Sequence, residues 1–448
     1  MTLPEVNYLL RALCAPRRSI VMKYQVAGID VHKKMVAVVV ADVGREGEYQ
    51  FERRKFGTTG DQLHLLAQWL VQQEVEEVVM ESTAQYWRPV WGSLERYWRP
   101  ARRKREGATG MSGTLHLCQA KSNRGRRGRK NDFADAERLI KRLVAQELVL
   151  SFVPDPEQRL WRTVTRRKYQ LTRDKVRFQN QLESLLEQAH IKLSSLVSDL
   201  LGVSARRMLK AMADGETDPA ALAALADYRL RATPEQLRDA LGACGQLHGV
   251  YRRLLKMALE ELKLMEDQIE ELDREASELL QQHQDAVQRV AEVPGFGANS
   301  AIQIIAEVGP AAEAFESEKD LSSWVGVCPG EEESAGESKS TRSPKGNRTM
   351  RRLLNQAAHA AIKVKGSIFD VTFRRLLPRL KYKQAIWAIA HRLCRLLWKI
   401  LRKGVRYEER GPEVSAKSKR RRAARMIKEL KALGYRIEGG PVPAGAPA

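Results

Sequence analysis

The sequence has few cysteines, and their placement excludes two kinds of stabilising site. Its 448 residues include five cysteines, which are widely spaced, odd in number and never arranged as CxxC. This arrangement argues against a zinc site and against a disulfide framework. Because scattered free thiols are typical of a reducing compartment, we expect the protein to be cytoplasmic.

Long apolar runs and two common hydrolase motifs are also missing. No stretch approaches ~18 uninterrupted apolar residues, so no membrane span is predicted. The first 20 residues lack a long apolar core, which makes a secretory signal a poor interpretation, and residues 1–22 are expected to be a variable lead-in. The sequence holds no HExxH pair and no GxSxG elbow, which argues against zinc proteases and serine hydrolases.

Basic residues, by contrast, are abundant. Lysine and arginine total 77 against 55 acidic residues, giving a formal net charge of +22 and a pI of about 9.9. Such an excess favours a polyanionic partner, of which nucleic acid is the commonest. The alternative is a basic protein that has no such partner.

Residues 23–153 alternate between the periodicities of strands and helices. The pattern predicts strands at 24–30, 35–41, 49–56, 78–80 and 115–118, and helices at 63–71 and 132–144. Three strands, a helix and then alternating strands and helices is the element order of an RNase H-like domain. We therefore predict an α/β RNase H-like fold for this segment, by analogy of pattern.

A long helical region is predicted for residues 154–288, after a boundary at Pro154 and Pro156. Apolar residues recur every seven positions in two segments: Val164, Leu171, Phe178 and Leu185 in the first, and Leu255, Leu262, Ile269 and Ala276 in the second. Heptads of this length predict a coiled coil. They do not choose between an intramolecular helical hairpin and a dimerising stalk.

The remaining chain is predicted to form a mostly α-helical domain at 289–408 and a basic, partly disordered tail at 409–448. Val293-Pro294-Gly295-Phe296-Gly297 leads into a helix at about Ala298. Gly295 and Gly297 would let backbone N–H groups approach a phosphate, as in a helix-hairpin-helix element. An ordinary tight turn accounts for the same residues.

Four carboxylates occupy positions that suggest a divalent-metal site. Asp30 lies within an apolar strand and Glu81 closes another, where a charge is costly without a partner or a function. Asp132 and Asp135 share one face at the start of a helix. Oxygen ligands of this kind suit Mg²⁺ (or Mn²⁺) and phosphoryl transfer. Alternatively, Asp132 is an N-cap, Asp135 is an ordinary first-turn residue, and Asp30 pairs with a lysine or arginine.

Two groups of residues have the composition of phosphate-binding segments. The first is a glycine-interrupted basic loop directly before Asp132, and the second follows a glycine-rich loop near the C-terminal domain's centre. Their members are Arg124, Arg126, Arg127, Arg129 and Lys130, and then Lys345, Asn347, Arg348, Arg351 and Arg352. The alternative is a solvated charged surface.

Ser334 stands in the glycine-rich segment before the second group. Cations nearby would lower the cost of an alkoxide and of a charged transition state. From the residues alone, Ser334 is one candidate for a nucleophile, beside Ser338, Ser340 and Ser343.

The chain resembles the DEDD-type insertion-sequence transposases from about residue 24 to residue 407. The resemblance is carried by GIDVHK (28–33), VVMEST (78–83), GRKNDFADA (128–136), VPGFG (293–297), WVGVCPG (324–330), ESAG (333–336) and KGNRTMRR (345–352). Lys130-Asn131-Asp132 has Asn where Thr is frequent, which leaves the acidic residues intact.

The resemblance implies a RuvC-like domain with Asp30, Glu81, Asp132 and Asp135 as metal ligands and Ser334 as the nucleophile that links covalently to DNA. It implies donor and target DNA and a bridge RNA as partners, in a bacterial, nucleoid-associated setting. It also implies a homo-oligomer, from dimer to tetramer, in which domains of different subunits build a composite site. The alternatives are a junction-resolving nuclease that uses water, and a non-catalytic nucleic-acid-binding protein.

Overall fold

The computed structural model describes residues 24–43, 49–99, 114–120, 131–329, 332–334, 337–340, 343–409, 424 and 427–428. The chain divides into two compact units, one up to Val153 and one from Pro154. The division falls at the two prolines where the sequence predicts a boundary. The predicted lead-in at 1–22, and the basic tail apart from residues 409, 424 and 427–428, lie outside the described residues.

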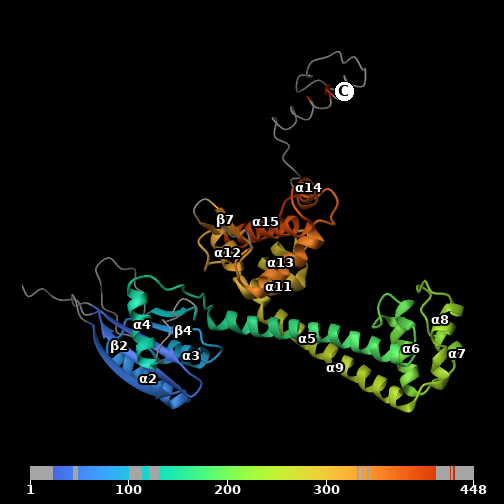
Figure 1. Ribbon diagram of the computed structural model, residues 1–448, viewed down its shortest axis with the longest axis horizontal. Coiled ribbons are helices and arrows are strands. Elements are labelled where there is room, and N and C mark those ends of the chain that lie inside the picture. The colour runs from blue at the N-terminus through green and yellow to red at the C-terminus, as the bar shows by residue number, and fades with distance from the viewer. Residues whose placement is uncertain are drawn as a thin grey trace, which may run out of the picture. The chain divides into compact units, whose positions relative to one another are not determined.

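The first unit is built on a five-stranded mixed sheet (Figure 1). The strands are β1 (Gln25–Val31), β2 (Met35–Asp42), β3 (Gln50–Gly57), β4 (Glu77–Glu81) and β5 (Thr114–Cys118). Their order in the sheet is β3-β2-β1-β4-β5. Strands β1, β2 and β3 pair antiparallel, whereas β4 pairs parallel with both β1 and β5. This is the strand order of an RNase H-like sheet, as the sequence pattern predicts.

Helices cover both faces of this sheet, which explains why β1 and β2 are almost continuously apolar. Helices α2 (Gly60–Gln72) and α3 (Trp87–Tyr97) pack on one face, where Ala27, Ile29 and Val31 of β1 lie. Helix α4 (Asp132–Val144) packs on the other face, against Val26. Because side chains alternate along a strand, Asp30 shares the α4 face with Val26 and Gly28.

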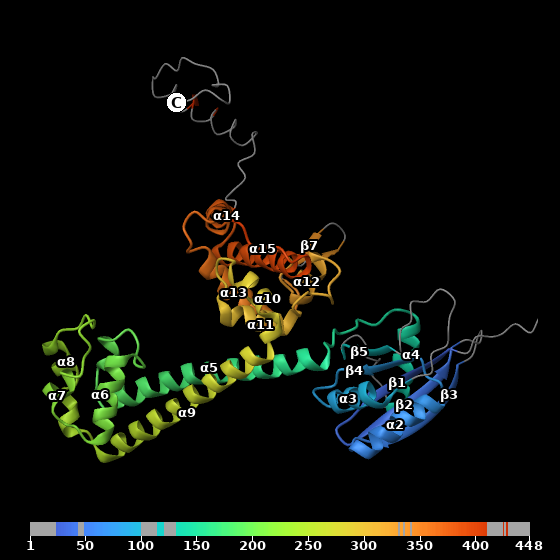
Figure 2. The same ribbon diagram turned by 180° about the vertical axis from the view of Figure 1, so that it is seen from behind.

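The second unit begins with two long helices, α5 (Pro156–Gln188) and α9 (Gly249–Leu279), which pack along each other within the chain. They lie side by side in both views (Figures 1 and 2). Ion pairs join Lys168 to Asp273 and Lys175 to Glu266, so the helices run antiparallel. The chain thus forms the helical hairpin that was one of the two expectations. A true coiled coil and a dimerising role stay predictions.

A small helical head connects the two long helices. It contains the α-helices α6 (Val203–Asp214), α7 (Pro219–Ala223) and α8 (Pro234–Ala240) and the 3₁₀-helices η1 (Leu193–Ser195) and η2 (Gly242–Gln246). Its core includes Met208, Leu209 and Leu237 and continues into the adjoining ends of α5 and α9 through Leu182 and Leu255. The head therefore shares one hydrophobic core with the adjoining ends of helices α5 and α9.

The C-terminal part of the second unit is mostly helical, as predicted. After the 3₁₀-helix η3 (Gln281–His283), its elements are α10 (Gln284–Ala291), α11 (Ala298–Val308), α12 (Glu318–Val325), β6 (Glu332–Ser334), β7 (Glu337–Ser340), α13 (Arg348–Ala361), α14 (Ile368–Leu376) and α15 (Tyr382–Lys403). Helix α15 packs against α10, α12, α13 and α14 and buries a row of apolar residues. Among the described residues, no helix is both long and apolar enough to cross a membrane.

Candidate active site

Gly28 allows helix α4 to approach strand β1 closely. A Cβ atom at this position would lie 2.3 Å from the carbonyl oxygen of Ala136 and 2.9 Å from a side-chain carbon of Ile140. Both residues belong to α4, so any larger side chain at residue 28 would push the helix away from the strand. The glycine of the Gly28-Ile29-Asp30 sequence therefore brings the first turn of α4 close to Asp30.

Helix α4 is capped by Asn131, which corrects the expectation that Asp132 is the N-cap. The side-chain oxygen of Asn131 accepts a hydrogen bond of 3.1 Å from the backbone N–H of Phe133, and Asp132 is the first helical residue. Because the neighbouring asparagine satisfies the helix end, the Asp132 carboxylate does not serve as the cap. Asp132 and Asp135 both lie in the first turn, as expected.

The four predicted carboxylates come together at the carboxyl ends of β1 and β4 and the start of α4. In the parallel pairing of β1 with β4, Ile29 lies opposite Met80, which places Asp30 and Glu81 at neighbouring positions beyond this pair. Glu81 alternates with Val79, whose side chain packs with Leu139 of α4. Glu81 therefore lies on the same face of the sheet as Asp30.

The charge of Asp30 is affected by all three other carboxylates. Asp30 is only 8% exposed, and burial raises the pKa of its carboxyl above the ordinary value. His32 opposes this rise in pKa, whereas the negative charges of Asp135, Asp132 and Glu81 add to it. A bound cation would relieve mutual repulsion of this kind between clustered carboxylates.

His32 lies within this cluster, although the residue patterns did not single it out as a site residue. Its Nε2 atom is 3.1 Å from Oδ2 of Asp30 and 3.3 Å from Oδ1 of Asp132. Among the described residues, the ion-pair partner of Asp30 is thus a histidine, whereas the alternative named a lysine or arginine. An available signal was the two-residue spacing from Asp30, which is typical of side chains on one face of an extended segment.

Asp135 also contacts a cation of its own helix. It forms an ion pair with Arg138, three residues further along α4. Both side chains are partly buried, so this arginine reduces the negative charge at one edge of the cluster. The ordinary first-turn role considered for Asp135 is thus present alongside its position in the cluster.

The arrangement fits a divalent ion. Asp30, His32 and Asp132 each offer one ligand atom, and these atoms all lie within 4.8 Å of one another. Oδ2 of Asp30 is buried and has no hydrogen-bond partner in the part of the chain that the structure describes. A buried carboxylate oxygen without a donor is costly. Its free lone pairs suit a hard cation such as Mg²⁺ or Mn²⁺.

The structure places Ser334 at the end of a two-stranded hairpin in the second unit. Strand β6 ends at Ser334, which lies opposite Glu337 of β7 in antiparallel register. Ser334 is thus the last residue of β6, and its pair with Glu337 is the last one in the register of the two strands.

Arg351, which was predicted to bind nucleic acid, joins the two ends of the loop from Gly326 to Pro344 that contains this hairpin. Its guanidinium donates hydrogen bonds to the carbonyl oxygen of Gly326, before the hairpin, and to that of Pro344, after it, at 3.0 Å. A Cβ atom at Gly346 would lie 2.2 Å from the carbonyl oxygen of Val325, so the two ends of the loop touch. The loop's base is therefore held at a fixed width.

Asn347 and Arg352 also make contacts within the protein. Asn347 caps α13 by accepting a 3.0 Å hydrogen bond from Met350 N–H, and it donates one of 2.9 Å to the buried carboxylate of Glu307. The guanidinium of Arg352 lies 3.6 Å from the ring centroid of Tyr169 on α5. Lys345 and Arg348 are exposed. Nucleic-acid binding by these five residues stays a prediction, and these contacts give three of them a structural role.

Gly295 lies in the turn between α10 and α11 and has a packing role. Its φ is +95°, and a Cβ atom there would lie 2.3 Å from the carbonyl oxygen of Ala357 on α13. Gly297 is the N-cap of α11. The turn therefore needs Gly295 for close approach to α13, while phosphate contact and a helix-hairpin-helix function stay predictions. The basic residues Arg124, Arg126, Arg127, Arg129 and Lys130 lie outside the described residues.

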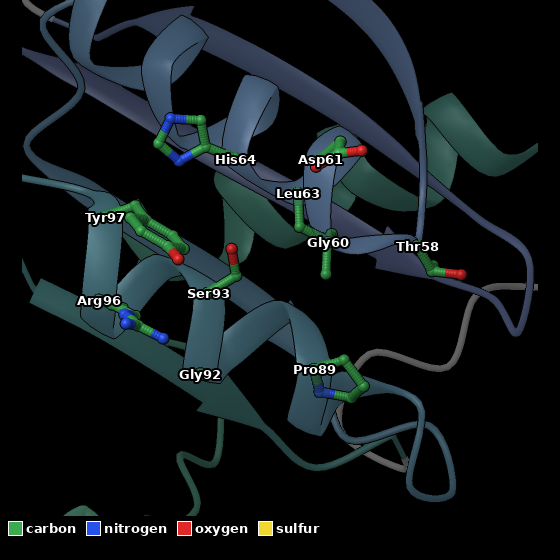
Figure 3. A pocket seen from close by; sticks show the side chains of 10 residues that line it. All are labelled: Thr58, Gly60, Asp61, Leu63, His64, Pro89, Gly92, Ser93, Arg96 and Tyr97. Carbon is green, nitrogen blue, oxygen red and sulfur yellow. The ribbon is translucent and has the colours of Figure 1, made fainter.

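A hollow of about 610 Å³ lies elsewhere in the first unit, between α2 and α3 (Figure 3). His64 of α2 and Tyr97 of α3 both line it and contact each other edge to face, with ring centroids 4.6 Å apart. None of the four carboxylates lines this hollow. The candidate site is thus defined by converging charges rather than by a cavity.

Two family models match the chain in the segments that carry these features. Residues 27–191 match the DEDD model of IS110, described as a transposase, and residues 287–372 match the model of the transposase IS116/IS110/IS902 family. Together the matches cover more than half of the chain. The chain belongs to the IS110 family of DEDD-type transposases. The first match contains all four carboxylates, and the second contains Ser334.

Curated relatives carry the same kind of name. A probable family 20 transposase of Pseudomonas aeruginosa is 29% identical over 155 residues, which cover 33% of this chain and 44% of that protein. The putative transposase y4pF/y4sB of Sinorhizobium fredii is 25% identical over 182 residues, covering 39% and 46%. Each match therefore spans less than half of the relative's length. Among solved structures, RuvC of Thermus thermophilus matches with 11% identity and a TM-score of 0.21, over 28% of this chain and 99% of that one.

Proposed function

We propose that this member of the IS110 family is a transposase that cleaves and rejoins DNA through a covalent phosphoserine link, in a divalent-metal-dependent reaction. The convergence of Asp30, Glu81, Asp132 and Asp135 at one end of a RuvC-like sheet carries the proposal. Family membership and the net charge of +22 support DNA as the substrate.

In the proposed reaction, the oxygen of Ser334 attacks a backbone phosphorus. A phosphorus–oxygen bond to serine forms while the bond to one deoxyribose oxygen breaks; the serine loses its proton and the leaving oxygen gains one. Attack by a hydroxyl of another strand reverses these steps and rejoins the DNA. Because the covalent link conserves the phosphodiester energy, rejoining needs no external energy source.

The four carboxylates would hold a divalent ion, Mg²⁺ or Mn²⁺, with Asp30 as its most buried ligand. When bound, such an ion stabilises negative charge at the reacting phosphate. Asn131 fixes the start of α4, and Gly28 sets the distance between that helix and β1. These two residues thus position the ligands, while Arg351 holds the loop that carries Ser334.

The proposal includes partners that the family resemblance implies. A bridge RNA would select donor and target DNA by base pairing, while lysine and arginine side chains would contact the nucleic-acid backbones. A homo-oligomer, from dimer to tetramer, would bring the carboxylate domain of one subunit to the serine domain of another. A bacterial cytoplasm with its nucleoid is the expected setting.

A plasmid recombination assay tests the proposed function. Wild-type protein, Ser334→Ala and Asp30→Asn are incubated with donor and target plasmids, the element's flanking non-coding RNA and Mg²⁺. We expect recombination and a protein–DNA adduct on a denaturing gel with wild type only. If Ser334→Ala still cleaves DNA while Asp30→Asn does not, the protein is a nuclease that uses water. If Asp30→Asn retains full function, the carboxylates are structural.

A further inference from the structure

His32 has an unusual position for a histidine beside two carboxylates. Its Nε2 atom is buried and lies 3.1 Å from Asp30 Oδ2 and 3.3 Å from Asp132 Oδ1. Yet within the described residues neither Nε2 nor Asp30 Oδ2 has a hydrogen-bond partner. The distances are short enough for hydrogen bonds, so their directions must be unsuitable. The ring nitrogen and the carboxylate oxygen are close neighbours without being bonded to each other.

These separations suit atoms that share a metal ion. Two ligands at right angles, each about 2.1 Å from an octahedral ion, stand about 3.0 Å apart. The distances from His32 Nε2 to both carboxylate oxygens are close to this value. Asp30, which is 8% exposed, supplies an unsatisfied oxygen to the same group of ligand atoms.

We propose that His32 is a direct ligand of the divalent ion, through Nε2, so that the site combines nitrogen and oxygen ligands. The inference rests on the proposed function, because it concerns the metal site of that function. Imidazole nitrogen suits Mn²⁺ and later transition-metal ions better than Mg²⁺, which prefers oxygen. His32 therefore shifts the selectivity of the carboxylate site away from Mg²⁺ and towards Mn²⁺.

The rival explanation gives His32 the opposite effect on metal affinity. A protonated His32 would be a counter-ion that partly neutralises Asp30 and Asp132. A bound metal ion would have to displace it, and removing the histidine would then tighten binding. The sign of the change in affinity therefore separates a ligand from a counter-ion.

Mn²⁺ binding to the full chain, without nucleic acid, tests this proposal. Electron paramagnetic resonance counts free Mn²⁺, and its pulsed form detects ¹⁴N coupling from a coordinated imidazole. We expect ¹⁴N coupling in wild type and its loss in His32→Ala and His32→Gln. Mn²⁺ affinity should fall at least ~10-fold in both variants, and Mg²⁺ affinity, measured by competition, should fall less. His64→Ala, on helix α2, is the matched control and should behave as wild type.

The possible outcomes separate this inference from the proposed function. Bound Mn²⁺ that is lost in Asp30→Asn but shows no ¹⁴N coupling in wild type overturns the role of His32 alone. Tighter Mn²⁺ binding by His32→Ala does the same. If Asp30→Asn does not weaken Mn²⁺ binding, both the metal site of the proposed function and the role of His32 are wrong. Absence of ¹⁴N coupling in the wild type overturns the role of His32 even if a variant fails to fold.

Discussion

Burial and neighbouring negative charges both disfavour the charged form of the Asp30 side chain. Its carboxyl is buried on the face of β1 that α4 covers, and three other carboxylates repel its negative charge. Both effects raise its pKa, while His32 compensates only in part. A buried carboxyl with a raised pKa in a cluster of carboxylates is a candidate for a functional role rather than a stabilising one.

We therefore expect Asp30→Asn to stabilise the metal-free protein at neutral pH. The variant removes a buried charge, so the first unit's melting temperature should rise by a few degrees, the shift that about 1 kcal/mol produces in a domain of this size. Because the folded-state pKa is raised, this difference should be small below the ordinary pKa of aspartate. It should grow as pH rises through the raised pKa. Thermal unfolding with a chelator, from pH 3 to pH 8, measures it.

The exposed Asp61 on α2 gives a control for this experiment. Asp61→Asn removes a charge from the same unit, and its melting temperature should follow wild type across the pH range within the small effect typical of surface changes. A wild-type protein that melts above Asp30→Asn at neutral pH without metal would show that the Asp30 charge is compensated in the fold.

At the residue scale, the sequence predicts the acidic residues of the candidate site better than their neighbours. Asp30 and Glu81 are recognisable because each interrupts or ends an apolar strand, which only a partner or a function explains. The capping role expected for Asp132 was wrong, because Asn131 one residue earlier satisfies the same helix end. The contact of His32 with Asp132 could not be predicted, since it depends on how α4 packs against β1.

At the element scale, the distance between β1 and α4 decides whether the carboxylates meet. We expect Gly28→Ala to destabilise the first unit by about 1–3 kcal/mol, the usual cost of overpacking. The added methyl group would lie 2.3 Å from the Ala136 carbonyl oxygen, so α4 would have to move. Mn²⁺ affinity should fall together with stability, because Asp132 and Asp135 move with the helix. Chemical denaturation and metal titration measure the two effects.

Gly92→Ala is a matched control for Gly28→Ala. Gly92 lies within helix α3, and an added Cβ atom meets nothing within 4 Å. Because alanine favours a helix over glycine, this variant should be more stable by up to ~1 kcal/mol, with unchanged metal affinity. Equal behaviour of the two variants would contradict the packing role assigned to Gly28.

Helix α5 is attached to α11 by a buried ion-pair network centred on Glu307, which is fully buried. Its carboxylate accepts hydrogen bonds from Arg166 at 2.7 and 2.8 Å. Burial by itself would raise the pKa of Glu307, but Arg166, Arg162 and Asn347 outweigh it, so the pKa is lowered. The same carboxylate thus joins the long helix to the residue that caps α13.

We expect Glu307→Gln to cost about 3 kcal/mol of unfolding free energy, because it leaves two arginines without their buried partner. Because the folded-state pKa is lowered, the stabilisation is present above the ordinary glutamate pKa and is lost as pH falls through the lowered value. The difference between wild type and variant should therefore shrink in acid. Denaturant unfolding at pH 7 and pH 3 measures this, with the exposed Glu260→Gln as control.

The elements of the first unit are largely predictable from the sequence, because β-branched runs and amphipathic periods give clear patterns. Helix α3 was not predicted; Pro89 and Gly92 lie within it and weaken its helical pattern. The helical hairpin of α5 and α9 was predicted only as one alternative. Heptads bury the same residues against a neighbouring helix of their own chain or of another, so the sequence cannot choose between the two.

At the scale of the whole molecule, the proposed composite site makes a prediction about mixed subunits. Asp30→Asn and Ser334→Ala should each be inactive alone, yet a mixture should recover roughly a quarter of wild-type recombination. In random dimers, half are mixed, and each mixed dimer has one site with both an intact serine and an intact carboxylate set. The plasmid recombination assay measures this recovery after the two proteins have been allowed to exchange subunits.

A mixture of two variants that are defective in the same unit is the control for that experiment. Asp30→Asn mixed with Asp132→Asn should remain inactive, because each subunit then has a defective carboxylate set. Absence of recovery in the first mixture, with subunit exchange demonstrated, would place the serine and the carboxylates of each active site in one subunit.

Helices α5 and α9 form an antiparallel pair, called the arm here. The contacts that fix its two ends do not depend on how long the pair is. One end is fixed by the Glu307 network and the other by the core of the helical head. Seven residues could be added to each helix, between the Lys168–Asp273 and Lys175–Glu266 pairs. This insertion would lengthen the arm by about 10.5 Å, and the same face of each helix would still contact the other helix. Seven residues added to one helix alone would break the pairing. The arm is therefore a spacer. Its length can change, by evolution or by design, only when both helices gain or lose the same number of heptads.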